Sequence, residues 1–275
     1  MVAFHRLLLT LLRGRRTDTP LAINERGGGG RKKSNRRMEF KYRQFTVRQD
    51  NAAMKVGTDS DLLGTLAEGG SRILDIGTGT GIIALMMAQR CPEAQVVAIE
   101  IDENAVKDAC ENFRSSPFAD RIVLRHTSFQ DYLKAEDDGA APQFDCVVCN
   151  PPYFDKSTEC PDRGRTRARH SSSLPFSVLA SGAYKMLTEG GVFSVCIPPE
   201  VLYAFRAECL FAGFCERRIY SIKSLPGKPP KRYVLVFGKG KAEAPISETF
   251  CMRNSDGSIS DWYRWQMREF HDSHH

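Results

Sequence analysis

A glycine-rich turn between a strand pattern and a helix pattern constrains this chain more than any other feature. The run at 71–75 has the length and apolar content of a buried strand, and the run at 82–90 has the apolar content of a helix packed in a core. Between them, glycine occupies every second position, at Gly77, Gly79 and Gly81. Glycines at a strand-to-helix junction indicate a turn whose backbone a ligand can approach closely.

The spacing of these glycines favours S-adenosylmethionine (SAM) over a dinucleotide as the ligand. Nicotinamide and flavin folds use Gly-x-Gly-x-x-Gly, whereas the pattern here is Gly-x-Gly-x-Gly and the acidic Asp75 precedes it. We expect Asp75 to accept hydrogen bonds from the ammonium group of SAM or to hold the turn. Glu100 ends the next predicted strand, 19 residues after Gly81, where its carboxylate can accept bonds from both hydroxyls of a ribose.

Strand and helix patterns alternate along the chain, which predicts a Rossmann-like α/β fold with a mostly parallel, doubly wound sheet. We expect seven strands, of which the last two form an antiparallel terminal pair. Asp102 is placed to cap the helix after the second strand. Ser128 and Phe129 follow the third strand, where the adenine of the cofactor would pack, although Phe129 could equally belong to the core. The expected strands are 71–75, 95–100, 121–125, 144–149, 191–197, 217–222 and 232–237, and the expected helices are 82–90, 103–113, 174–187 and 199–211.

The tetrapeptide Asn150-Pro151-Pro152-Tyr153, directly after the fourth predicted strand, is the most specific chemical signal. An amide nitrogen, or an amino nitrogen conjugated to a ring, is a poor nucleophile because its lone pair is delocalised. Two acceptors on its hydrogens, the Asn150 side-chain oxygen and the Pro151 carbonyl, would favour a more tetrahedral nitrogen in the transition state. The prolines fix the backbone, and Tyr153 offers a face for stacking a planar base. The pattern predicts methylation of an amide-like nitrogen.

The net charge of +6 comes from the first 37 residues, which hold ten Arg or Lys and two acidic residues. We expect residues 1–37 to be a disordered basic leader, with an RNA-binding arm or a targeting segment as alternatives, and residues 38–275 to form one methyltransferase domain. An RNA-binding surface must then consist of local patches. The candidates are Arg163, Arg165, Arg167, Arg169 and His170 after the catalytic loop, and Lys223, Lys228, Lys231 and Arg232 between the last two strands.

The nine cysteines show no disulfide or zinc-binding pattern apart from Cys146-x-x-Cys149. Both of these lie in one predicted strand, where their side chains would point to opposite faces of the sheet and could not easily bind one ion. We therefore expect no metal and a reducing, cytoplasmic location. The apolar stretch at 7–12 is too short to span a membrane, and no obligate protein partner is expected.

From Met38 onward the chain resembles the bacterial tRNA1(Val) (adenine(37)-N6)-methyltransferase family, within the class I SAM-dependent methyltransferases. The stretch Lys55-Val-Gly-Thr-Asp59 discriminates best, because Asn-Pro-Pro-Tyr occurs in many amino and amide methyltransferases. The resemblance implies methylation of N6 of adenine 37 beside the anticodon, with the base flipped into the pocket. It adds Lys55, Thr58 and Ile101 to the expected cofactor site, although Thr58 could equally cap a helix. The segments that match are 45–50, 53–59, 74–81, 99–102, 150–154 and 167–170.

The same residues are also compatible with other functions. A protein glutamine methyltransferase uses the same tetrapeptide on an amide nitrogen, but it would normally have an additional helical domain for which residues 38–70 are too short. A guanine-N2 or DNA-adenine methyltransferase would share the chemistry. Outside the enzymes, a tRNA-binding chaperone could bind SAM without catalysis, and the intact Asn150 and Tyr153 count against it.

Overall fold

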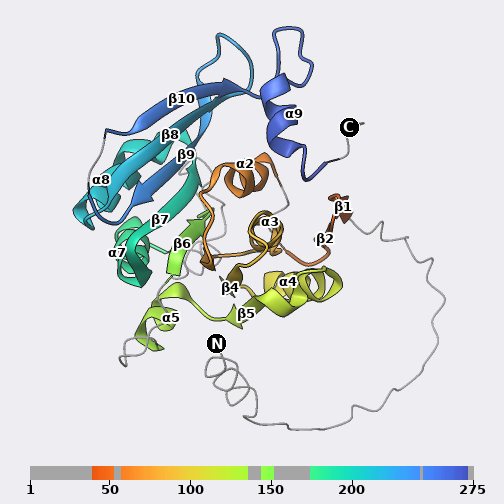
Figure 1. Ribbon diagram of the computed structural model, residues 1–275, viewed down its shortest axis with the longest axis vertical. Coiled ribbons are helices and arrows are strands. Elements are labelled where there is room, and N and C mark those ends of the chain that lie inside the picture. The colour runs from red at the N-terminus through yellow and green to blue at the C-terminus, as the bar shows by residue number, and fades with distance from the viewer. Residues whose placement is uncertain (1–38, 53–56, 136–143, 152–173, 242–243, 272–275) are drawn as a thin grey trace, which may run out of the picture. The chain divides into compact units, whose positions relative to one another are not determined.

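The central sheet of the computed structural model has eight strands (Figure 1). They are β3 (Arg72–Ile76), β4 (Gln95–Glu100), β5 (Ile122–His126), β6 (Phe144–Cys149), β7 (Leu187–Ile197), β8 (Cys215–Lys223), β9 (Pro230–Gly238) and β10 (Ile246–Cys251). Their order in the sheet is β10-β8-β9-β7-β6-β3-β4-β5, and neighbours from β7 to β5 are parallel. Strand β9 runs antiparallel to β7 and β8, as expected of the terminal pair. The structure describes residues 39–52, 57–135, 144–151, 174–241 and 244–271.

Helices cover both faces of this sheet (Figure 1). One face packs against α2 (Thr58–Leu66), α3 (Ile82–Arg90) and α4 (Glu103–Ser115), and the other against α5 (Phe129–Ala135), α7 (Phe176–Met186) and α8 (Leu202–Phe211). The remaining elements are the hairpin of β1 (Glu39–Lys41) and β2 (Thr46–Arg48), the short helices η1 (Ala119–Arg121) and η2 (Pro199–Val201), and α9 (Asp261–Met267). This is the Rossmann-like layering that the alternating pattern predicts.

Strand β6 shows how the sheet separates the two cores. Cys146 and Val148 belong to the core beneath α3, whereas Val147 and Cys149 belong to the core beneath α7. Because alternate residues of a strand face opposite sides, Cys146 and Cys149 point away from each other, which confirms that prediction. Residue Asn150 leaves the strand at its carboxyl end, in line with the ends of β3 and β4.

Sequence patterning predicted the bounds of α3 and β4 to the residue. The predicted cap of α4 by Asp102 is confirmed, because the Asp102 carboxylate accepts a bond from the Ala105 amide at 2.8 Å. The main sheet has one strand more than the seven expected, because β10 pairs with β8. Strand β10 is exposed or half-buried along its length, so no apolar run marks it. The expected cap by Thr58 is wrong, since α2 begins at Thr58 itself and its N-cap is Gly57.

Segments far apart in the sequence meet at α2, which is bonded to the loop between β1 and β2 and to α9. Asp61 of α2 is buried and accepts hydrogen bonds from the hydroxyl groups of Tyr42, at 2.9 Å, and Tyr263 of α9, at 3.4 Å. The Arg43 amide also donates to the Phe270 carbonyl at 2.8 Å. Burial raises the pKa of Asp61 to about 6, against the lowering effect of the two tyrosine bonds. These contacts fix the helix that brings Ser60 to the pocket described below.

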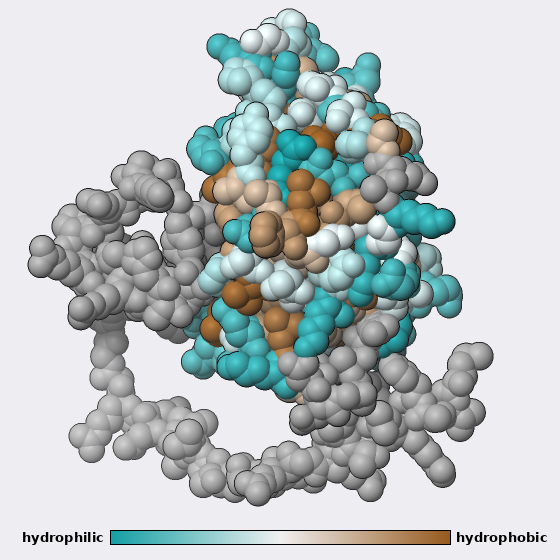
Figure 2. Space-filling view, turned by 90° about the vertical axis from the view of Figure 1, so that its left-hand side faces the viewer, coloured by the Kyte–Doolittle hydropathy of each residue, from teal (hydrophilic) through white to brown (hydrophobic). Residues whose placement is uncertain are grey.

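The surface over α8 is partly apolar. The helix leaves Tyr203, Leu210 and Phe211 exposed, the last at 95%. The view that turns this side of the molecule to the reader shows apolar groups gathered among polar ones (Figure 2). In the part of the chain that the structure describes, no helix is long and apolar enough to cross a membrane.

Arg121 binds carbonyl groups at the carboxyl end of α3, and replacing it should lower the free energy of unfolding. Its guanidinium donates to the carbonyls of Ala88, Cys91 and Ala94 at 2.7–3.1 Å. Since hydrogen bonds from a charged donor are worth more than neutral ones, Arg121→Ala should lower the free energy of unfolding by about 2–3 kcal/mol in urea denaturation. Arg114→Ala, at an exposed position of α4, serves as the control and should change it by about 0.5 kcal/mol or less. Equal effects of the two substitutions would contradict this assignment.

Candidate active site

The glycine turn after β3 folds over the end of β4. The amides of Gly77 and Thr78 both donate to the Ile99 carbonyl at 3.0 Å. Gly77 has a φ of +70° and Gly79 a φ of +58°, a left-handed backbone that disfavours side chains. A Cβ at either position would meet no protein atom within 4 Å, so packing against the protein does not require these glycines. The left-handed backbone conformation requires glycine at both positions, and the empty space beside them leaves the turn open to a ligand.

Gly81 is required for a different reason than the sequence suggested. Its φ is +86°, and a Cβ there would lie 2.4 Å from the ring of Phe113 on α4. Gly81 is therefore a packing glycine that lets α4 approach the start of α3. Unlike Gly77 and Gly79, it does not line the pocket.

Glu100 fastens the glycine turn to the end of β4. One oxygen of its carboxylate accepts a bond from the Gly79 amide at 2.8 Å, and the other accepts from the Ile101 and Asp102 amides, both at 2.8 Å. A carboxylate has about four acceptor positions, so about one is left for a ribose hydroxyl. The expectation that Glu100 binds both hydroxyls is thus narrowed to one, and its role in holding the turn is added.

Asp75 lies beneath the turn and is fully buried. One carboxylate oxygen accepts bonds from the Thr78 hydroxyl at 2.6 Å and the Ala84 amide at 3.1 Å, and the other has no hydrogen-bond partner among the described residues. Burial raises the pKa of Asp75 to about 7, although the two hydrogen bonds lower it; the nearby charge of Glu100 raises it further. Of the two expected roles, holding the turn is the one that these bonds perform.

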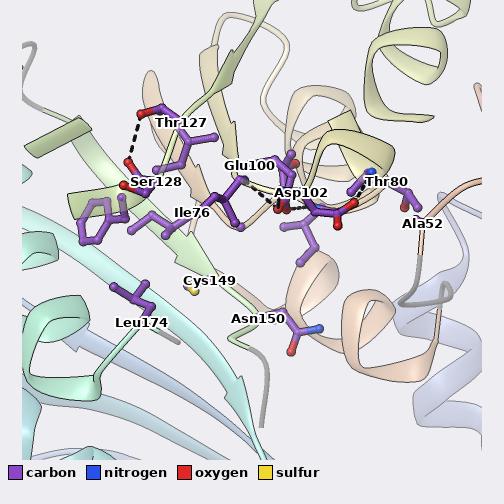
Figure 3. Close-up of a pocket in the computed structure, with 18 of the residues that line it drawn as sticks. Ala52, Ile76, Thr80, Glu100, Asp102, Thr127, Ser128, Cys149, Asn150 and Leu174 are labelled. Atoms are coloured by element: carbon purple, nitrogen blue, oxygen red, sulfur yellow. Dashed lines mark hydrogen bonds between the residues drawn. The ribbon is translucent and has the colours of Figure 1, made fainter. Parts of the chain in front are cut away.

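A pocket opens at the carboxyl edge of the sheet, between this turn and the end of β6 (Figure 3). Its described lining includes the acidic Glu100 and Asp102 and no lysine or arginine. Such a lining suits a cofactor with positive charge, an apolar ring system and hydroxyl groups, as SAM has, better than one with phosphates. The lining residues are Ala52, Ser60, Ile76, Gly77, Thr78, Gly79, Thr80, Ile82, Ile83, Ile99, Glu100, Ile101, Asp102, Ala105, Thr127, Ser128, Phe129, Gln130, Cys149, Asn150 and Leu174.

Ser128 and Phe129 line the pocket as expected, but both also have structural roles. The Ser128 hydroxyl donates to the Asp131 carboxylate at 2.7 Å and accepts from the Asp131 amide at 3.0 Å, so it caps the start of α5. The Phe129 ring packs against α7, where a Cβ at Gly182 would lie 2.6 Å from it. Ile101 is 52% exposed and lies at the pocket, which suits contact with a flat ring.

Asn150 enters the same pocket from β6 and comes close to the glycine turn through the sheet register. Cys149 is opposite Ile76, and Ile76 is opposite Ile99, so the three strands end together. The close-up draws the Asn150 side chain beyond Cys149, below Glu100 and Asp102 (Figure 3). Pro151, the next residue of the tetrapeptide, is buried. The other residues of the tetrapeptide, Pro152 and Tyr153, lie outside the described residues.

The second basic patch lies at the pocket edge of the sheet. Because β9 is antiparallel to β7, the loop from Lys223 to Lys231 is on the side where β7 ends. Lys228 and Lys231 are exposed. Arg232 instead pairs with Asp59 of α2 at 2.8 Å, a structural contact that the sequence did not predict. The first patch, Arg163, Arg165, Arg167, Arg169 and His170, lies outside the described residues, as does Lys55.

Sequence reasoning missed several residues that line the pocket. Ala52 and Ser60 flank the stretch Lys55-Val-Gly-Thr-Asp59, and extending that motif at each end would have found both. Thr58, which the resemblance suggested, does not line the pocket. Leu174 carries no local signal, because only the packing of α7 brings it there. Among the described residues, no group of acidic, histidine or cysteine side chains could hold a metal ion.

Comparison with known proteins gives consistent matches. A family model described as the methyltransferase small domain matches residues 52–166. A tRNA1(Val) (adenine(37)-N6)-methyltransferase of Bacteroides fragilis is 40% identical over 234 residues, covering 84% of this chain and 97% of that protein. A protein of the same name from Phocaeicola vulgatus is 44% identical with the same coverage.

Among solved structures, a predicted O-methyltransferase, protein Atu636 of Agrobacterium tumefaciens, superposes with a TM-score of 0.60. The two chains are 20% identical, and the match covers 77% of this chain and 96% of that one. At this identity the likeness shows the fold alone.

Proposed function

Because the chain belongs to the tRNA1(Val) (adenine(37)-N6)-methyltransferase family, we propose that it methylates N6 of adenine 37 beside the anticodon of a valine tRNA. SAM is the cofactor, and when bound it supplies an electrophilic methyl group on a sulfonium. The acidic lining around Glu100 and Asp102 supports SAM as the cofactor, because SAM carries positive charge and no phosphate. The glycine turn and Glu100 hold the cofactor, and Ile101 and Phe129 contact its adenine.

The observation that carries the proposal is the position of Asn150 in the pocket that the glycine turn and Glu100 also line. An amide side chain in this pocket supports the proposal, because the amino group of a base would have to meet the methyl donor there. The Asn150 oxygen and the Pro151 carbonyl accept bonds from the two hydrogens of that amino group. They favour the tetrahedral nitrogen of the transition state as fixed dipoles, without a metal or a covalent nucleophile. For Pro152 and Tyr153, which lie outside the described residues, the sequence alone predicts that they complete this site, with Tyr153 stacking on the flipped adenine.

The tRNA backbone runs along the pocket edge of the sheet. Lys223, Lys228 and Lys231 contact its phosphates. For the basic side chains at 163–170, which lie outside the described residues, the sequence alone predicts the same role. Exposed lysines attract phosphate without reading sequence, so the choice of adenine 37 comes from the pocket and from the shape of the anticodon loop.

This surface predicts a salt-dependent loss of tRNA affinity. Replacing both Lys228 and Lys231 with alanine should weaken tRNA binding and reduce the slope of log affinity against log salt by about 1–2, because about one counterion is released per phosphate contact. The matched control replaces Lys185 and Lys241, which are exposed at the opposite edge of the sheet. Filter binding across a salt series measures the slopes, and an unchanged slope in the first double variant would exclude this loop from the interface.

The proposed function is tested with defined substrates. An unmodified valine tRNA transcript should accept a methyl group from labelled SAM, and the same transcript with guanine at position 37 should not. A release factor is the competing substrate, because a glutamine methyltransferase would label it and leave both transcripts unlabelled. Binding of SAM and tRNA without labelling of any substrate would favour a chaperone.

A further inference from the structure

Two buried polar side chains of α4 bind the chain segment that precedes α2. Asp108 is 4% exposed, and one of its carboxylate oxygens accepts bonds from the amides of Asn51 and Ala52 at 2.9 and 2.8 Å. The other oxygen accepts from the Asn51 side chain at 2.7 Å. A buried carboxylate with three donors fixes the residues that supply them, because losing any donor would leave charge unsatisfied.

Asn112, one turn further along α4, joins the same segment to the glycine turn. It is fully buried, and its side-chain oxygen accepts from the Arg48 amide at 2.8 Å. Its nitrogen donates to the Arg48 carbonyl at 2.9 Å and to the Thr80 carbonyl at 2.8 Å. One amide thus ties residues 48–52 to the turn that binds the cofactor.

These bonds end at the wall of the pocket. Ala52 and Thr80 both line it, and the close-up labels them at the end of the site opposite Thr127 and Ser128 (Figure 3). The amino-terminal end of α4 also reaches the pocket, through Asp102 and Ala105. A single helix therefore sets three parts of the wall: its own first turn, the end of the glycine turn, and Ala52.

We propose that Asp108 and Asn112 are positioning residues that set the affinity for SAM by holding residues 48–52 against the glycine turn. The inference rests on the proposed function only for the identity of the cofactor. Because neither Asp108 nor Asn112 lines the pocket, they act through its wall and affect cofactor binding more than the rate of methyl transfer. Preorganising a wall before binding raises affinity by removing the cost of ordering it.

Two substitutions of Asp108 distinguish a positioning role from a requirement for its negative charge. In Asp108→Asn, the amide oxygen can still accept from the Asn51 and Ala52 amides, and the Asn51 side chain can flip to accept from the new amino group. In Asp108→Ala, both backbone amides lose their acceptor. Positioning therefore predicts that asparagine restores what alanine removes.

The test measures binding of S-adenosylhomocysteine (SAH) by calorimetry, with hydrogen exchange at residues 48–52. Asp108→Ala should weaken SAH binding about tenfold or more and speed exchange at these residues, and Asp108→Asn should stay within about threefold of the wild type. The KM for SAM should rise in Asp108→Ala with kcat at saturation within about threefold. The control for the change of charge is Asp120→Asn, because Asp120 is an exposed carboxylate outside α4. This substitution should change neither the SAH affinity nor the hydrogen exchange at residues 48–52.

If Asp108→Ala does not fold, Asn51→Ala replaces it, because it removes one donor and leaves α4 intact; its SAH affinity should fall about threefold. Unchanged SAH affinity in the folded variants, or an equal loss in the alanine and asparagine variants, would overturn the proposal. Wild-type protein that binds SAH but labels no tRNA would count against the tRNA substrate alone and leave this inference standing.

Discussion

Asn150→Ala should lower the rate of methyl transfer at saturating SAM by about a hundredfold or more, as expected for the loss of a fixed dipole that stabilises a transition state. The affinity for SAH should stay within about threefold of the wild type, because the glycine turn and Glu100, which we propose to hold the cofactor, are unchanged. Single-turnover methylation of the valine tRNA transcript, with SAH binding measured by calorimetry, separates the two effects.

Gln130→Ala is the matched control, since Gln130 is another amide that lines the pocket. Its substitution should leave the single-turnover rate within about fivefold of the wild type, because no contact with the reacting nitrogen is proposed for it. A near-normal single-turnover rate in Asn150→Ala would contradict the mechanism in which Asn150 and Pro151 accept bonds from the amino group. Equal losses in both variants would indicate a general disturbance of the pocket instead.

Glu100→Ala should weaken SAH binding by about a hundredfold or more. The substitution removes the proposed acceptor for a ribose hydroxyl and leaves the amides of Gly79, Ile101 and Asp102 without the carboxylate that now binds them. The lost bond to the ribose hydroxyl is worth about 1.5–3 kcal/mol, and the loosening of the glycine turn adds to this loss, so the two effects together suffice for this change. Thermal unfolding with and without SAH should show that the stabilisation by the ligand largely disappears.

Two variants control for this effect. Glu100→Gln keeps one acceptor oxygen but turns its amino group toward a backbone donor, so its SAH affinity should fall between those of the wild type and Glu100→Ala. Glu103→Ala removes an exposed carboxylate three residues further on, which pairs with Lys107, and should leave SAH affinity unchanged. If Glu100→Ala bound SAH as tightly as the wild type, Glu100 would not belong to the cofactor site.

Local patterns predicted the elements that carry the site, because the signals for them lie within a few residues. The apolar run of α3, the strand that ends at Glu100 and the cap at Asp102 were all predicted where the structure has them. The bonds of the Glu100 carboxylate to three backbone amides were not, since they depend on how the glycine turn folds over β4.

Contacts between distant segments account for what the sequence did not reveal. Ala52 reaches the pocket because Asp108, more than fifty residues later, binds the segment that contains it. Arg232 was assigned to RNA from the charge of its loop, but Asp59 on α2 binds its guanidinium. Strand β10 escaped prediction because an edge strand with one neighbour needs no continuous apolar run.

The most direct test of the central claim is methyl transfer from labelled SAM to total tRNA from bacteria that lack this modification, followed by nucleoside digestion and mass analysis. The proposed function predicts labelled N6-methyladenosine that maps to position 37 of a valine tRNA and disappears with Asn150→Ala. Labelled release factor with unlabelled tRNA, or a methylated nucleoside other than N6-methyladenosine, would contradict it.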